Sequence, residues 1–92
     1  PGPGVQAPTV VKRPQPRYPD AARRLGRTAV VILRLLIDEQ GNVAEIQHNG
    51  PKAGMGFDRA AVAAAEKTTW QPAMVGDVPV KMWIDLRIEF KP

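Results

Sequence analysis

The side chains that could carry out catalysis or bind a metal are few and scattered. His48 is the only histidine, and the 92 residues include neither cysteine nor serine. Ser-His-Asp sites, Cys-His sites and multi-histidine metal sites are therefore excluded within this sequence. The clustered acids, Asp38, Glu39 and Asp58, lie in an expected turn and at an expected helix start, where such residues stabilise the backbone. We expect no enzyme, no bound metal and no cofactor.

Positive charge is concentrated at the front of the chain. The formal net charge is +4, and residues 1–34 hold seven Lys and Arg against one acid, whereas residues 35–92 hold six against eight. A basic segment can bind nucleic acid, anionic lipid or an acidic partner, or it can be a solvated linker and helix face. Tyr18 is the single aromatic residue of residues 1–34. Because stacking on bases needs more aromatic side chains, we expect no nucleic-acid partner.

The elements that must position any site begin after a Pro-rich and Gly-rich start. Residues 1–13 are expected to be a flexible, semi-extended linker, of which Pro1–Gly4 could be a vector-derived remnant, and residues 14–92 a single domain. The chain begins at Pro1 without a signal-peptide pattern, and we interpret it as a fragment of a longer protein. It has no run of 18 apolar residues, so this fragment is not expected to span a membrane.

Hydrophobic patterning predicts two helices and three strands. The helices are expected over 18–26 and 57–70, and the strands over 28–37, 43–48 and 81–90, with a turn over 75–79. Strand 28–37 is apolar on both faces apart from Arg34, so it belongs at the centre of the sheet. A hairpin and a right-handed helical crossover then give the order 2-1-3. The predicted fold class is α+β, a three-stranded antiparallel or mixed sheet with two helices on one face.

The last strand, residues 81–90, would form a long exposed edge. No proline interrupts it, although Lys81, Arg87 and Glu89 add charge. The charges could simply protect the edge from unwanted pairing. Alternatively, the edge could dock an extended peptide that adds to the sheet as a further strand.

Trp83 lies on the polar face of the same strand. It could form a cross-strand pair with Val30, Ile32 or Leu36, which would stabilise the sheet. The alternative is a patch for self-association or for a partner, and the apolar outer face of strand 28–37 leaves a homodimer possible.

Five short motifs resemble the TonB C-terminal domain of the TonB/TolA superfamily. No single motif is specific, but the five occur in the family's order and spacing over residues 14–91, with mild departures such as Phe57 in place of Leu. The motifs are Gln15-Pro16-Arg17-Tyr18-Pro19; Ile37-Asp38 with Gly41 and Val43; Phe57-Asp58 with Ala60-Ala61; Trp70-Gln71-Pro72-Ala73; and Gly76 with Pro79-Val80.

The resemblance implies a periplasmic domain of an inner-membrane-anchored protein in a Gram-negative bacterium. It implies work with an ExbB/ExbD-type motor and binding to the TonB box of an outer-membrane TonB-dependent receptor, as in siderophore and iron transport. The box would add to the edge of the last strand. Carried onto this sequence, the partner-binding residues are Gln15, Pro16, Arg17, Tyr18 and Pro19 in one segment, and Lys81, Met82, Trp83, Ile84, Asp85, Leu86, Arg87, Ile88, Glu89 and Phe90 in the other.

A second interpretation stays open at this point. Related domains occur in TolA-like, motility and secretion assemblies that cross the cell envelope, where the partner is not a transport receptor. The sequence does not separate these assemblies from TonB-type transport.

Overall fold

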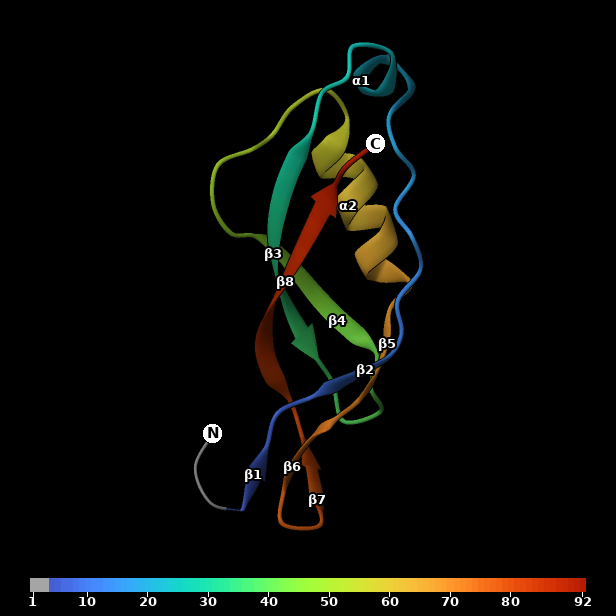
Figure 1. Ribbon diagram of the computed structural model, residues 1–92. Coiled ribbons are helices and arrows are strands. Elements are labelled where there is room, and N and C mark those ends of the chain that lie inside the picture. The colour runs from blue at the N-terminus through green and yellow to red at the C-terminus, as the bar shows by residue number, and fades with distance from the viewer. Residues whose placement is uncertain (1–3) are drawn as a thin grey trace.

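A three-stranded antiparallel sheet forms the centre of the computed structural model, which describes residues 4–92 (Figure 1). Strand β3 (Ala29–Ile37) lies between β4 (Val43–His48) and β8 (Met82–Phe90). The predicted order 2-1-3 and the α+β class are confirmed, and every paired ladder is antiparallel. The suggested remnant at Pro1–Gly4 lies, except for Gly4, outside the described residues.

One face of this sheet carries the hydrophobic core. Buried and exposed side chains alternate over residues 30–35 of β3 and 85–90 of β8, as the pleat of a strand requires, whereas Leu36 and Trp83 on the outer face are half-buried. Helix α2 (Phe57–Glu66) covers this face with its alanines, and helix α1 (Asp20–Arg24) adds Ala22 to the same core. The core residues are Ala22, Val31, Leu33, Leu35, Ile37, Phe57, Ala61, Ala65, Leu86, Ile88 and Phe90.

Helix α1 is short and ends at a glycine in the left-handed region. Gly26 has φ 65°, which a residue with a side chain rarely adopts. The Gly26 N–H donates to Arg23 O and the Arg27 N–H to Ala22 O, the two bonds of a Schellman cap. The cap turns the chain directly into β3.

Helix α2 ends earlier than predicted. The expectation of a helix through residue 70 is wrong after Glu66, because Lys67 caps the helix and Thr69–Gln71 form strand β5. The Thr68 hydroxyl donates to Ala65 O at 2.7 Å. The two adjacent threonines are β-branched and favour extended backbone over a further helical turn.

Within residues 4–12 the chain forms two paired strands, which corrects the expectation of a flexible, semi-extended linker there. Strand β1 (Val5–Gln6) pairs with β6 (Ala73–Val75), and β2 (Thr9–Lys12) pairs with β5. Strand β6 also pairs with β7 (Val78–Val80), so the predicted turn over 75–79 is a tight hairpin. The division of the chain at residue 13 stays a prediction. We call residues 4–12 the strap.

Strand β5 is joined to the central sheet through the turn between β3 and β4. Gly41 in this turn has φ 82° and is buried, and the Trp70 N–H donates to Gly41 O at 2.9 Å. A Cβ atom at position 41 would lie 1.9 Å from Trp70 O, so only glycine allows this approach. No helix within residues 4–92 is both long and apolar enough to cross a membrane.

Candidate functional site

The outer edge of β8 presents unpaired backbone groups. Among residues 4–92, no strand pairs with β8 on the side away from β3. Ile32 lies directly opposite Arg87, and the Asn49 N–H donates to Ile32 O on the β4 side. Since backbone groups alternate in direction along antiparallel strands, the N–H and C=O of Arg87 point away from β3.

A side-chain contact agrees with this direction. The Arg13 guanidinium donates to Arg87 O at 2.6 Å from the free side of β8. By the same alternation, Asp85 and Glu89 present their backbone groups outward, whereas Leu86 and Ile88 pair with β3. The free edge therefore offers donors and acceptors at every second residue over 85–89.

A groove of about 370 Å³ runs beside this edge. One wall is the segment 13–16, which we call the groove wall, and the other is β8 over 86–89. The floor comes from Ala64 and Ala65 of α2 and from Thr68, which follows the helix. The small side chains of α2 leave space between the helix, the wall and the edge of β8, and this space suits an extended chain.

The first predicted segment divides between this groove and the core. Gln15 and Pro16 line the groove, and Arg17 is exposed and lies 3.7 Å from the Asp20 carboxylate. Tyr18 packs edge-on against the rings of Phe57 and Phe90, and its hydroxyl donates to Arg27 O. Pro19 is the N-cap residue of α1. Tyr18 and Pro19 thus fix the end of the groove wall to the body.

The second predicted segment is divided in the same way. Leu86, Arg87, Ile88 and Glu89 line the groove, while the buried Phe90 belongs to the core. Lys81 precedes β8 and is exposed, and Met82, Trp83, Ile84 and Asp85 lie on β8 beyond the groove. That these residues bind a partner stays a prediction.

Trp83 forms a cross-strand pair, which is one of the two roles that the sequence suggested for it. The register places it directly opposite Leu36 on the outer face of the sheet. The Arg34 guanidinium lies 5.5 Å from the centre of the indole ring, which is within cation–π range. Val30 and Ile32 continue this face and are about 40% exposed.

Charges alternate in sign along the groove mouth. The Arg87 guanidinium lies 3.3 Å from the Glu89 carboxylate, and the Lys91 ammonium lies 3.3 Å from its other oxygen. The hydrogen bond from Lys91 and the nearby charges hold the pKa of Glu89 below its usual value, against the opposing effect of desolvation. Glu89 is therefore ionised, and the guanidinium of Arg13 adds positive charge to the facing wall.

Sequence reasoning did not find Arg13, Ala64, Ala65 or Thr68 as parts of the site. The sequence predicted a helix over 57–70, but not which helix face borders the edge strand. Arg13 falls in the segment expected to be a linker. Its contact with Arg87 joins residues that are 74 positions apart in the sequence.

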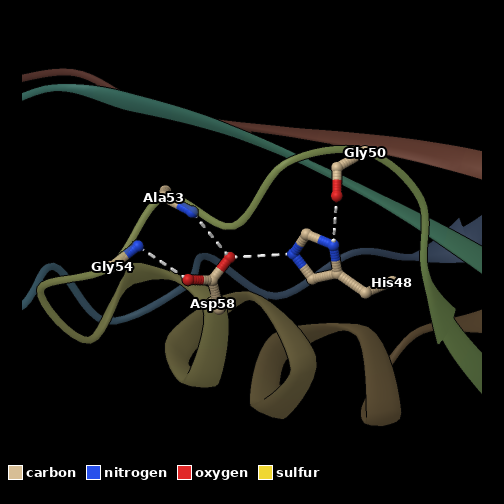
Figure 2. Close-up of polar contacts among 5 residues, drawn as sticks. All are labelled: His48, Gly50, Ala53, Gly54 and Asp58. Atoms are coloured by element: carbon tan, nitrogen blue, oxygen red, sulfur yellow. Dashed lines mark hydrogen bonds and ion pairs between the residues drawn. The ribbon is translucent and has the colours of Figure 1, made fainter.

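A second polar cluster lies between the end of β4 and the start of α2 (Figure 2). His48 Nε2 is 2.8 Å from Asp58 Oδ1, and His48 Nδ1 is 3.0 Å from Gly50 O. The Asp58 carboxylate also accepts from the Ala53 and Gly54 N–H groups at 3.1 and 2.8 Å. The cluster fastens the loop 49–56 to α2, and the sequence analysis did not foresee the His48–Asp58 pair.

The ionisation of Asp58 follows from these contacts. Desolvation raises the pKa of the carboxyl, but the hydrogen bonds from Ala53, Gly54 and His48 and the charge of His48 outweigh it, so the pKa lies below its usual value. With no serine or cysteine in the chain, the pair has no hydroxyl or thiol nucleophile of those types to activate. We assign it a role in loop structure.

Comparison with protein families gives a match over residues 14–92. The matching family is described as the Gram-negative bacterial TonB protein C-terminal. The match begins within the groove wall, so it includes residues 14–16 of the wall, both helices and the central sheet, and it excludes Arg13 and the strap.

Two curated relatives and one solved structure are similar to this chain. Protein tonB2 of Pseudomonas aeruginosa is 35% identical over 85% of the chain, and Protein TonB of Vibrio cholerae is 32% identical over 84%. The chain spans 29% and 32% of the length of these relatives. The solution NMR structure of the Pseudomonas aeruginosa TonB CTD superposes with a TM-score of 0.74 at 22% identity, covering 99% of this chain and 89% of that one.

Proposed function

Because the chain belongs to the family of Gram-negative bacterial TonB C-terminal domains, we propose that it is the periplasmic, partner-binding module of a TonB-type energy transducer. It binds the TonB box at the N-terminus of an outer-membrane TonB-dependent receptor. The relatives are about three times as long as this chain. We assign the inner-membrane anchor and the contact with an ExbB/ExbD-type motor to the rest of such a protein. The domain transmits force and carries out no catalysis.

The free edge of β8 is the observation that carries this proposal. Arg87 and its neighbours at alternate positions point their backbone groups away from β3. A peptide that adds to this edge satisfies those groups by strand pairing. Each hydrogen bond contributes about 1 kcal/mol, so several of them in one ladder give a specific but reversible contact.

The groove supports the same assignment, because it has space for a chain beside the edge. Its wall contains Pro14 and Pro16, which have no N–H and cannot form a regular ladder with β8. The wall therefore borders the edge without filling it. Arg13 and Arg87 favour a box that carries acidic residues.

Transmission of force follows from the way the edge strand is embedded. Strand β8 pairs along its full length with β3, and its inward side chains belong to the core. A pull on a peptide paired with β8 is thus distributed over the central sheet. Gradient-driven transport of a substrate such as a siderophore is the process that this module serves.

The test is an NMR titration of the ¹⁵N-labelled protein with decapeptides. The peptides are taken from the N-terminal segments of TonB-dependent receptors of Pseudomonas aeruginosa and Vibrio cholerae. We expect shifts concentrated in residues 13–19 and 85–89. Absence of shifts with every peptide would contradict the proposal and favour a TolA-like, motility or secretion partner.

A matched pair of variants tests whether the backbone of β8 is responsible. Arg87→Pro removes an outward N–H, and prolines are tolerated where the N–H of an edge strand faces solvent. Arg87→Ala removes the same side chain but keeps the N–H. We expect Arg87→Pro to bind at least about tenfold more weakly than Arg87→Ala, a difference of about 1.4 kcal/mol. Equal affinities in two folded variants would show that the β8 edge is not the docking site.

A further inference from the structure

We propose that the strap, residues 4–12, positions the groove wall and thereby sets the affinity of the groove for an extended peptide. This inference rests on the proposed function and adds to it a specificity-determining element outside the segment that matches the family. The strap itself does not line the groove. It acts through the wall that follows it in the chain.

The groove wall is held at two ends. At its C-terminal end Tyr18 is packed in the aromatic cluster with Phe57 and Phe90. At its N-terminal end the chain continues directly into β2, which pairs with β5 through Thr9, Val10 and Lys12. Between these ends, the one hydrogen bond recorded from the described wall to β8 joins Arg13 to Arg87 O.

The strap is held mainly by its backbone. Its side chains are exposed apart from the buried Pro8 and the half-buried Val5, and Val10 and Val11 are 45% and 63% exposed. None of its residues belongs to the core cluster. Elements with little apolar burial open at a fraction of the free energy of global unfolding.

The ladder that holds the strap is also interrupted. The pairs between β1 and β6 end at Gln6–Met74, and those between β2 and β5 resume at Thr9–Gln71. Residues 7–8 and 72–73 lie between them, and each of these stretches contains a proline that has no N–H to donate. The strap is therefore fixed by two short ladders.

Release of the strap leaves the groove wall attached by Tyr18 and by the single hydrogen bond from Arg13 to Arg87 O. The wall can then move away from β8, and the groove loses one side. For a protein that binds only with the wall in place, the apparent dissociation constant rises in inverse proportion to the fraction of molecules in that state. The strap thus controls binding although it does not contact the peptide.

The experiment uses a removable cross-link in the full chain. Because the chain contains no cysteine, Gln6→Cys with Met74→Cys introduces a single pair. These residues are opposite each other across β1 and β6. Opposite residues in antiparallel strands have Cα atoms about 4.5–5.5 Å apart, which a disulfide can span.

A third substitution, Thr9→Pro, weakens the strap in the same protein. Trp70 directs its N–H to Gly41, so its neighbour Gln71 faces the strap and pairs with Thr9. Proline at position 9 removes the backbone N–H of Thr9, which faces Gln71, but it is compatible with extended backbone. Thr9→Ala keeps the donor and is the control.

We expect the reduced triple variant to bind the receptor decapeptides at least about tenfold more weakly than its oxidised form, as if the wall were in place in about one molecule in ten. The Thr9→Ala control should show less than about a twofold difference between the two forms. Because a disulfide also stabilises the whole fold, unchanged amide signals of β3 on reduction are what separates positioning from a general loss of stability. Equal affinities for reduced and oxidised Thr9→Pro protein would overturn the inference.

A second readout does not depend on a peptide. Reduction of the triple variant should shift the amide signals of Gln15, Arg87 and Glu89 and leave those of β3 unchanged. Failure of the wild-type protein to bind any peptide would count against the proposed function, whereas unchanged Gln15, Arg87 and Glu89 signals on reduction would count against the strap. The two proposals therefore fail in distinguishable ways.

Discussion

Two regions of this molecule are held together by different means. The body, made of β3, β4, β8 and α2, contains nearly all of the buried large apolar side chains. The strap region, made of β1, β2, β5, β6 and β7, is paired in short ladders but leaves Val10, Val11, Val75 and Val78 exposed. Figure 1 shows β1, β6 and β7 at the lower end of an elongated molecule, while β5 continues the chain from the lower end of α2.

The difference teaches that paired strands are not equally stable strands. In the body, side-chain burial and backbone bonds act together, and each fully buried large side chain contributes about 1.5–3 kcal/mol. In the strap region the backbone bonds act almost alone, and each contributes about 1 kcal/mol net. Stable and easily opened strands therefore occur within one small domain.

The largest effect should come from the aromatic cluster of the body. Phe90→Ala removes a ring that contacts both Tyr18 and Phe57 and is 2% exposed. We expect a loss of about 3–5 kcal/mol in the free energy of unfolding. Chemical denaturation measures this loss. A loss below about 1 kcal/mol would show that burial of core side chains is not what stabilises the body.

The next largest effect should come from the junction between the two regions. Gly41→Ala places a Cβ atom against Trp70 O at a residue with φ 82°. Left-handed backbone costs a residue with a side chain about 1–3 kcal/mol, and the clash adds to it. We expect a loss of about 3 kcal/mol and lower hydrogen-exchange protection at Trp70. Unchanged hydrogen-exchange protection of the Trp70 amide in this variant would mean that other contacts hold the junction together.

A matched pair of valines compares the regions directly. Val31→Ala in β3 deletes fully buried methyl groups and should cost about 2 kcal/mol. Val11→Ala in β2 changes a side chain that is 63% exposed and should cost less than about 0.5 kcal/mol. Thermal and denaturant unfolding of both variants give the comparison. Similar costs at the two positions would remove the distinction between body and strap region.

The smallest effect concerns the loop cluster of the body and depends on pH. The pKa of Asp58 is lowered in the folded protein relative to the ordinary value of 3.8. The ionised carboxylate therefore stabilises the fold above that value, and this stabilisation is lost as the pH falls through the folded pKa. Subtracting the profile of Asp58→Asn from that of the wild type isolates this contribution. If the difference in the free energy of unfolding between wild type and Asp58→Asn did not change between pH 2 and pH 6, the stabilising role of the Asp58 carboxylate would be contradicted.

The sequence predicted the body well because burial leaves a pattern in it. Apolar residues alternate in 81–90 and fill both faces of 28–37, and these patterns identified β8 as an edge and β3 as the centre. The edge strand, half of the candidate site, was found in this way. The other half was indicated only by the resemblance of Gln15–Pro19 to a known motif.

The strap region was missed for the same physical reason. Its strands bury few side chains, chiefly Ala73 and part of Trp70, so their residues show little alternation, and the prolines of residues 1–16 indicated a linker. Backbone pairing at 5–12 depends on partners at 69–75, more than 55 residues away. No local pattern in the sequence encodes such a pairing. The end of α2 was misplaced for the same reason, because Thr69–Gln71 form β5 and pair with β2.

The course of the strap has a mechanical consequence. Its ladder bonds run across the strands, so tension at Gly4 parallel to the strap loads each ladder in shear, and its bonds resist together. Tension at right angles to the strap instead unzips the ladders one bond after another, beginning at the Gly76 N–H bond to Gly4 O. Through the groove wall, retention of a bound peptide then depends on the direction of the applied force as well as on its size.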